Sequence, residues 1–208
     1  MIAILITTLL QVLAYAFVPF LVYVVRHRKV KGFPAWIGFR RAPRRAWLIA
    51  TAFTVVLAVP VLWMFSLPGL REMATGPGTS ASYVRGAGGG INAIVLLLLI
   101  AWLQTGLAEE ILFRGFVAQR LIDRLGFVAG NTLQALLFGV LHVVLYMGLA
   151  KSELPLYQMA VLFLVPGLIA FALGWLKVRA ADGSILPGWW AHGLSNTLAV
   201  GIMAFLWS

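Results

Sequence analysis

The sequence predicts an all-α protein, a polytopic membrane helix bundle of about six transmembrane helices. The chain has 208 residues, of which 62% are hydrophobic and only 11% are charged. Soluble domains are about 45–50% apolar and about 25% charged, so a soluble fold of this size could not bury so much apolar surface. The chain contains no cysteine, which excludes a disulfide scaffold, thiol catalysis and thiolate metal sites.

Six apolar segments are long enough to cross a membrane as helices. We expect these helices at roughly residues 2–25, 46–67, 91–120, 127–149, 156–176 and 187–207. The first segment has no basic leader and no small-residue cleavage site, which favours a spanning helix over a signal peptide. Residues 68–90 are rich in glycine, proline and serine and predict a flexible outer loop. We therefore expect one integral membrane domain, residues 1–208, with two spans and this loop in 1–90 and a helix bundle in 91–208.

The charges are unevenly distributed, with 16 Lys and Arg against 6 Asp and Glu. Alternating spans leave Arg71, Arg85 and Lys151 on one side of the membrane, which we assign as the outside, together with both termini. The excess of basic residues thus predicts orientation and gives no reason to expect a nucleic-acid partner. The remaining basic residues lie on the other side, the predicted cytoplasmic side: Arg26, Arg28, Lys29, Lys31, Arg40, Arg41, Arg44, Arg45, Arg114, Arg120, Arg124, Lys177 and Arg179.

Ionisable residues inside spans are costly and are therefore candidates for function. The first cluster is Glu109-Glu110 followed by Arg114 in the third span. Glu110 and Arg114 are four residues apart, so they share a helix face and can pair. Glu109 lies about 100° around the helix and has no such partner. This leaves the Glu109 carboxylate free to titrate and to act as a base.

Two further clusters lie in the fourth and sixth spans. Phe138 precedes His142 by one turn, and His192 precedes Asn196 by one turn on one helix face. Each pair alone is equally compatible with helix packing. All three clusters nevertheless fall at similar depth in the cytoplasmic half of the membrane, which predicts that they meet in one site. A neighbouring stripe of small residues would let the sixth span approach its neighbours closely: Ala191, Ser195 and Ala199.

Two other kinds of hydrolytic site are disfavoured. Ser195 lies off the His192 face and no G-x-S-x-G turn surrounds it, which disfavours a serine nucleophile. The chain has no H-E-x-x-H, which disfavours a membrane zinc protease of that kind.

The ordered set of motifs resembles the CAAX protease and bacteriocin-processing family, also called CPBP or Abi, which includes the CAAX prenyl endopeptidases. The set comprises Glu-Glu-x-x-x-Arg at 109–114, Phe-x-x-x-His at 138–142 and His-x-x-x-Asn at 192–196. Segment 183–186, leading into His192, is also similar to the family's third motif region, and the resemblance covers about residues 100–207.

The resemblance implies an intramembrane glutamate-dependent endopeptidase without a metal or other cofactor. Glu109 would be the catalytic glutamate and His142 its partner on the water, while His192 and Asn196 would stabilise the oxyanion. Glu110 and Arg114 would hold the first motif, with Phe138 supporting the second. The resemblance also implies peptide or protein substrates, of which lipidated CAAX peptides are the best known in the family. Nothing in the sequence indicates that a prenyl group is required.

Two alternatives stay open at this point. Glu109, His142 and His192 could bind zinc with an open fourth position. Alternatively, the chain could be a non-catalytic membrane protein, such as an immunity factor, a scaffold or a proton-coupled transporter. Its carboxylate and histidine cluster would then be a proton or ligand relay. Under every hypothesis the lipid bilayer is a partner.

Overall fold

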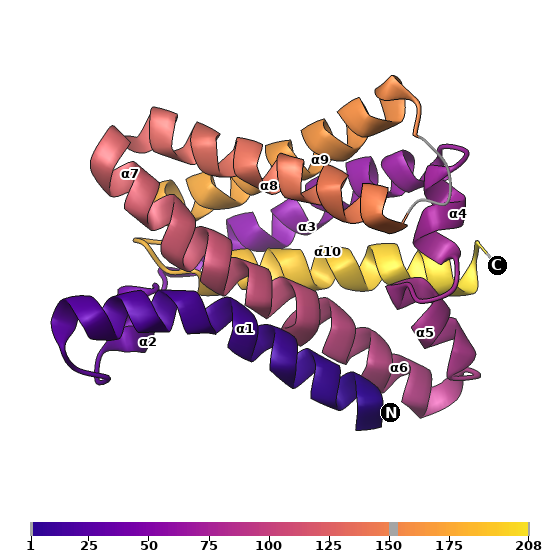
Figure 1. The fold of residues 1–208 in the computed structure, drawn as a ribbon, viewed down its shortest axis with the longest axis horizontal. Coiled ribbons are helices and arrows are strands. Elements are labelled where there is room, and N and C mark those ends of the chain that lie inside the picture. The colour runs from indigo at the N-terminus through magenta and orange to yellow at the C-terminus, as the bar shows by residue number, and fades with distance from the viewer. Residues whose placement is uncertain (1, 150–153, 208) are drawn as a thin grey trace.

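A computed structural model describes residues 2–149 and 154–207, and within these ranges the chain is helical with no strand (Figure 1). Long helices run roughly side by side, with short helices at both ends. In chain order they are α1 (Ile2–His27), α2 (Phe33–Trp36), α3 (Arg44–Ser66), α4 (Leu70–Thr75), α5 (Ser80–Gly86), α6 (Gly90–Leu98), η1 (Leu99–Leu107), η2 (Glu110–Ala118), α7 (Gln119–Leu125), α8 (Phe127–Leu149), α9 (Leu156–Trp175), η3 (Leu176–Ala180) and α10 (Leu186–Phe205).

Five helices in the described ranges are long and apolar enough to cross a membrane, which confirms the prediction of a multi-pass integral membrane protein. They are α1, α3, the continuous helix Gly90–Leu125, α8, and the helix Leu156–Ala180. The sixth expected span forms α10 but is not among the five, because His192, Ser195 and Asn196 reduce its hydropathy. Helix α10 instead packs along α3 and η1, so its polar residues are shielded by protein.

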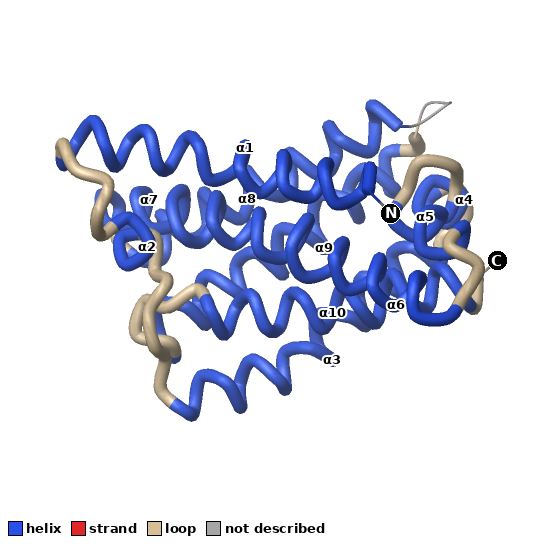
Figure 2. Tube along the Cα trace, turned by 90° about the horizontal axis from the view of Figure 1, so that it is seen from below, coloured by secondary structure: helices blue, strands red, loops and turns tan. Residues whose placement is uncertain are grey.

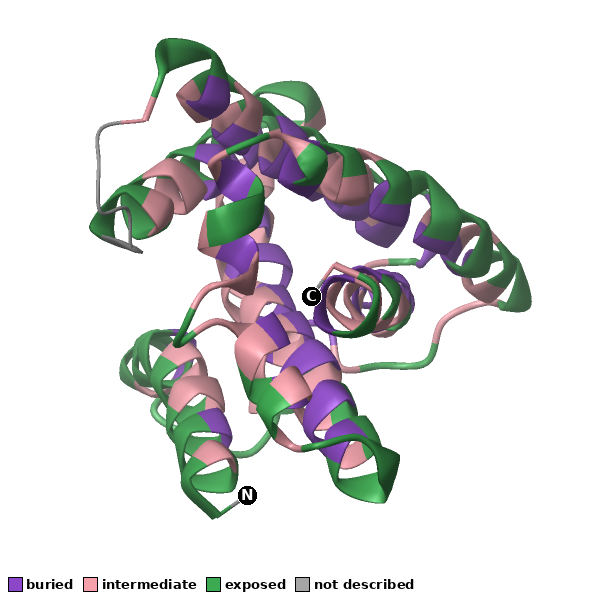
Figure 3. Cartoon of the chain, turned by 90° about the vertical axis from the view of Figure 1, so that its right-hand side faces the viewer, coloured by how far each residue is buried: buried purple, intermediate pink, exposed green. Residues whose placement is uncertain are grey.

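The outward faces of the long helices are apolar, as a lipid environment requires. Leu13 of α1, Val55 of α3, Val144 of α8 and Leu168 of α9 are all exposed. Figure 3 shows exposed residues along the outer faces and buried residues on the faces that the helices turn toward one another. Helix α1 is the most peripheral of the long helices, with only 11% of its most apolar window buried.

Small residues bring α10 close to its neighbours, as the sequence predicted. Ala191, Ser195 and Ala199 are all buried, and Ala191 packs in a cluster with Leu57 of α3 and Leu173 of α9. On the η1 side, a Cβ on Gly193 would lie 2.6 Å from the ring of Trp102. The short distance means that α10 can lie against η1 only with glycine at this position.

The third span differs from the regular α-helix that the sequence predicted. Its middle, η1 and η2, is wound as a π-helix, in which backbone hydrogen bonds run from residue i to residue i+5. A π-turn holds more residues than an α-turn, so consecutive side chains are separated by less than 100°. The adjacent Glu109 and Glu110 can therefore both face α10.

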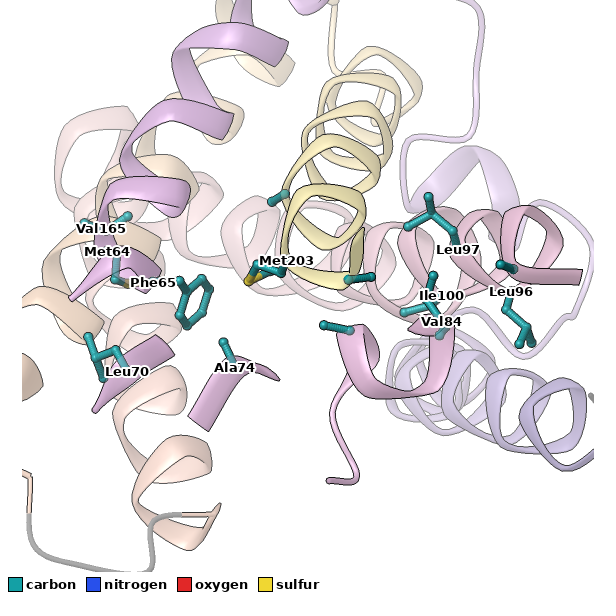
Figure 4. Close-up of a cluster of buried hydrophobic side chains, with 14 of the residues drawn as sticks. Met64, Phe65, Leu70, Ala74, Val84, Leu96, Leu97, Ile100, Val165 and Met203 are labelled. Atoms are coloured by element: carbon teal, nitrogen blue, oxygen red, sulfur yellow. The ribbon is translucent and has the colours of Figure 1, made fainter. Parts of the chain in front are cut away.

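The glycine-rich segment 68–90, predicted as a flexible loop, instead folds into α4 and α5 at one end of the bundle (Figures 1 and 2). Thr79 begins α5, and its hydroxyl accepts a hydrogen bond from the Ser82 amide. The Glu72 carboxylate accepts a hydrogen bond from the Gly69 amide at the start of α4. These short helices are stable because their buried residues join the core around Met64 and Met203 (Figure 4): Leu70, Ala74, Ala81 and Val84.

The basic segments gather at the opposite end, where α2, the α7–α8 turn and the η3–α10 turn meet (Figures 1 and 2). Both ends of the traced chain lie at the α4–α5 end, in agreement with the predicted alternation of spans. Lys151 lies outside the described residues. Lys177, which the charge pattern places with the basic residues that flank the spans, is only 2% exposed and belongs to the protein interior.

Candidate active site

The structure brings the four predicted catalytic residues together on one cavity. Glu109, His142, His192 and Asn196 all line a cavity of about 340 Å³ inside the bundle. They come from three separate helices: the η1–η2 junction, α8 and α10. Residues up to 87 positions apart in the sequence thus share one cavity only because of the packing of these helices.

His192 lies between the two adjacent glutamates. Its Nδ1 is 3.3 Å from Glu110 Oε1, and its Nε2 is 3.7 Å from Glu109 Oε2. The sequence left Glu109 without a partner on its own helix, and the partner in the structure comes from α10. A separation of 3.7 Å is too long for a direct hydrogen bond, but it is short enough for an ion pair when the imidazole carries a second proton.

Glu110 and Arg114 form the pair that their spacing predicted. Arg114 Nε is 3.3 Å from Glu110 Oε1, and both side chains are fully buried. A buried carboxylate and guanidinium offset each other's charge, and removing either would leave the other uncompensated. Glu110 is therefore engaged by Arg114 and His192, while the Glu109 side chain is 17% exposed and lines the cavity.

Phe138 connects the first and second clusters. The Arg114 guanidinium lies over its ring, 4.7 Å from the centroid, in cation–π geometry. The His142 ring packs against Phe138 with centroids 4.5 Å apart, and the Phe113 ring meets it edge-on at 4.7 Å. Phe138 thus holds the Arg114 and His142 side chains in fixed relation to each other.

A backbone contact determines which nitrogen of His142 carries the proton. His142 Nδ1 is 2.9 Å from the carbonyl oxygen of Phe138. A carbonyl oxygen can only accept, so Nδ1 donates and Nε2 of the neutral ring is left as an acceptor. Such a ring can accept a hydrogen bond from a water in the cavity.

Thr105 is a site residue that lies outside the three sequence motifs. Its hydroxyl accepts a hydrogen bond from Asn196 Nδ2 at 2.9 Å and donates to the carbonyl of Ile100 at 3.0 Å. The first contact fixes the orientation of the Asn196 amide, which keeps its second N–H. The sequence signal was the position of Thr105, beside Gln104, one turn before Glu109 in a mostly apolar run.

Gly188 and Lys177 also support the site without having been predicted to do so. A Cβ on Gly188 would lie 2.8 Å from Glu110 Oε2, so a larger residue there would displace the carboxylate that Arg114 and His192 hold. Lys177 Nζ donates to the Arg114 carbonyl at 2.9 Å and to Gln119 Oε1. Lys177 thereby ties η3 to the point where the π-turns of η2 end.

The described part of the chain contains no set of side chains placed to bind a metal ion. No group of three or more histidine, cysteine, aspartate or glutamate side chains there is arranged to hold a metal ion. The zinc hypothesis for Glu109, His142 and His192 therefore gains no support from the geometry.

The cavity extends away from the basic end of the bundle. From Glu109 it continues past Thr105 and Ile100 to Met73 and Ser80, on and beside the short helices α4 and α5. The sequence predicted a site facing the cytoplasmic half of the membrane. In the structure, the open space runs from the catalytic candidates to the end opposite the basic segments.

Comparison with known protein families identifies a match. The model of a family described as "Type II CAAX prenyl endopeptidase Rce1-like" matches residues 91–198, just over half of the chain. The matched region contains all three motifs, the four catalytic candidates and the residues that support them, whereas Met73 and Ser80 of the cavity lie outside it. No curated protein and no solved structure matches the chain.

Proposed function

Because the chain belongs to the Rce1-like type II CAAX prenyl endopeptidase family, whose members are glutamate-dependent membrane proteases, we propose that Glu109 activates the water that attacks the peptide bond. One observation carries the proposal: four polar side chains from three helices line one cavity in an otherwise apolar bundle. Polar groups converge in this way at hydrolytic sites, which need a base, a nucleophile and an oxyanion donor.

In the first step, Glu109 takes a proton from a water molecule while His142 Nε2 accepts the other water hydrogen and orients the oxygen. The water oxygen forms a bond to the carbonyl carbon, and the electron pair of the C=O bond moves to the carbonyl oxygen. The Glu109 carboxylate is the more loosely held of the adjacent pair, because Arg114 and His192 each lie 3.3 Å from Glu110, whereas His192 Nε2 lies 3.7 Å from Glu109.

The second N–H of Asn196 stabilises the resulting oxyanion. Its first N–H is held by Thr105, so the amide is oriented before the reaction begins. His192 adds to this stabilisation when its Nε2 carries a proton. One preorganised donor of this kind contributes on the order of 3 kcal/mol to the transition state.

In the last step, the oxyanion electron pair re-forms the C=O bond, the C–N bond breaks with its electron pair on nitrogen, and Glu109 returns the proton to that nitrogen. One carboxylate thus serves first as base and then as acid, and the reaction consumes only water and the peptide. Arg114, Phe138 and Glu110 act on this chemistry by holding His142 and His192 in position.

The Glu109→Gln variant tests the assignment. Glutamine has the same shape but cannot take the proton, so we expect cleavage to fall by at least about a thousandfold, the upper part of the range for general acid–base groups. Purified protein in proteoliposomes is incubated with a library of peptides, and mass spectrometry detects the products. Asp123→Asn is the matched control, because Asp123 is an exposed acid on the same long helix, away from the cavity. Full turnover by the Glu109→Gln variant would refute the proposal.

The substrate class follows from the membrane location. We infer a peptide that reaches the cavity at or within the bilayer, of which a prenylated CAAX peptide is the form named in the family's description. A farnesylated peptide and its unmodified twin, assayed side by side, determine whether the lipid is required.

A further inference from the structure

The connection between α1 and α3, residues 28–43, folds back over one end of the bundle. Figure 2 shows it at the same end as the loop that leads into α10. The Tyr23 hydroxyl of α1 donates to the Lys31 carbonyl at 2.6 Å, and the Arg120 guanidinium lies 3.9 Å from the centroid of the Trp36 ring. The α1–α3 connection is thus attached to α1 and to the third span, although it lies outside the matched family region.

The α1–α3 connection also holds the first turn of α10. The Ile185 amide donates to the Gly38 carbonyl at 3.0 Å, and the Ser184 hydroxyl donates to the Arg40 carbonyl at 2.7 Å. Ser184 and Ile185 are both fully buried. Amides at a helix start have no partner within the helix, so the connection supplies an acceptor at the point where α10 begins. His192 follows Ile185 by about two turns, so the position of this start affects where His192 lies.

Ile37 joins the α1–α3 connection to both helices that it covers. Its side chain is buried in one cluster with Ile111 of η2 and with Ile185. The backbone also approaches η2 closely, because a Cβ on Gly115 would lie 2.8 Å from the Ile37 carbonyl oxygen. Displacement of the connection would therefore loosen contacts on η2 and on α10 at the same time.

The outer side of this region is strongly cationic. Residues 26–45 contain eight lysine and arginine residues and no aspartate or glutamate. The neighbouring Asp182 lies 3.7 Å from Arg45. Like charges at this density repel one another, which opposes close folding of the α1–α3 connection onto α10. All eight basic residues are exposed: Arg26, Arg28, Lys29, Lys31, Arg40, Arg41, Arg44 and Arg45.

Apolar surface adjoins the cationic side directly. Val25 near the end of α1 is 70% exposed, and Leu48 near the start of α3 is 65% exposed. Val30, within the α1–α3 connection, is also 65% exposed. Clusters of lysine and arginine immediately beyond a spanning helix attract anionic headgroups. The adjoining apolar side chains favour a lipid over a soluble polyanion, because a lipid supplies both phosphate and hydrocarbon.

We propose that the α1–α3 connection binds the headgroups of anionic phospholipids and that this contact holds the first turn of α10 in place. The phosphates offset the repulsion among the basic side chains. They therefore favour the conformation in which Gly38 and Arg40 accept hydrogen bonds from the start of α10. The inference goes beyond the proposed function and does not depend on which residue takes the proton from water. It makes the packing of α10 beside Glu110 sensitive to the composition of the surrounding leaflet.

Amide hydrogen exchange in lipid nanodiscs tests the proposal. The full chain is placed in nanodiscs of phosphatidylcholine alone or with an equal part of phosphatidylglycerol, and mass spectrometry follows segment 183–190. We expect phosphatidylglycerol to slow exchange of this segment about tenfold, the effect of a ligand at roughly ten times its dissociation constant. Exchange in α5, at the opposite end of the bundle, should stay the same.

Two triple variants separate the effect of charge from the effect of side-chain shape. Lys29→Gln, Lys31→Gln and Arg41→Gln together remove three exposed charges and leave the backbone acceptors in place. This variant should lose the response to phosphatidylglycerol. In phosphatidylcholine alone it should already exchange more slowly than the unaltered protein, because fewer like charges repel. Lys29→Arg, Lys31→Arg and Arg41→Lys together keep the charges and should retain the full response.

Native mass spectrometry of protein released from the mixed nanodiscs measures the binding itself. The unaltered protein should retain more phosphatidylglycerol than the glutamine variant does. Equal exchange in the two lipid mixtures, or an undiminished response of the glutamine variant, would overturn the inference. Protection by glycerol phosphate or by a short RNA, added to phosphatidylcholine nanodiscs, would also overturn it, because the partner would then be a soluble anion. Neither measurement uses cleavage, so failure of the proposed function would leave these results unchanged.

Discussion

At the scale of single residues, the site depends on side chains that orient the reacting groups without touching the substrate. Thr105 is the clearest example, because its hydroxyl joins the Asn196 amide to the backbone of a π-helical turn. Lys177 has a similar role in the second π-helical segment, η2, where it donates a hydrogen bond to the Arg114 carbonyl. Both residues fix geometry in a region where the regular α-helical hydrogen bonds are absent.

The Thr105→Val variant tests this orienting role. Valine keeps the shape but removes the acceptor, so the Asn196 amide loses its fixed direction. We expect kcat to fall roughly tenfold, less than the hundredfold or more that follows the loss of an oxyanion donor itself, with little change in KM. Thr105→Ser retains the hydroxyl and should restore most of the rate. A purely structural role would instead lower the thermal unfolding temperature and leave kcat unchanged in the remaining folded protein.

At the scale of helices, close approach of α10 determines whether the three motifs meet. The motifs were predictable because Glu109, His142 and His192 are ionisable groups in apolar runs, where each is costly. The π-turns, Thr105 and the α4–α5 helices were not predictable from pattern. They depend on tertiary packing, which overrides the turn propensity of glycine and proline in 68–90 and the 3.6-residue period of the third span.

Two glycines that differ only in their surroundings test the importance of helix approach. Gly188→Ala would bring a methyl group within 2.8 Å of the buried Glu110 carboxylate, whereas a Cβ on Gly148 meets nothing within 4 Å. We expect Gly188→Ala to destabilise the protein by about 1–3 kcal/mol through overpacking. Gly148→Ala should be neutral or slightly stabilising, because alanine has the higher helix propensity. Unfolding in detergent micelles measures both. Equal stability of the two variants would mean that α10 can shift without cost.

At the scale of the whole molecule, the bundle is apolar on both the inside and the outside. Burying an apolar side chain therefore contributes less transfer free energy to the stability of this bundle than it does in a soluble protein. Lipid tails are as apolar as leucine, so moving a leucine from lipid to the protein interior gains little transfer free energy. What the interior provides is dense contact with neighbouring side chains. Leu173 of α9 is fully buried against Ala191 and Leu57, whereas Leu13 of α1 is 64% exposed on the outer face.

The Leu173→Ala and Leu13→Ala variants therefore should differ in stability although both remove the same atoms. Leu173→Ala leaves a cavity and should cost about 2 kcal/mol, the low end of the range for soluble cores, because the transfer part is missing. At Leu13 lipid fills the space, and the unfolding free energy should be unchanged within error. Reversible unfolding in a bilayer or in bicelles gives both values. A loss of similar size at Leu13 would show that this face of α1 packs against protein in the membrane rather than against lipid.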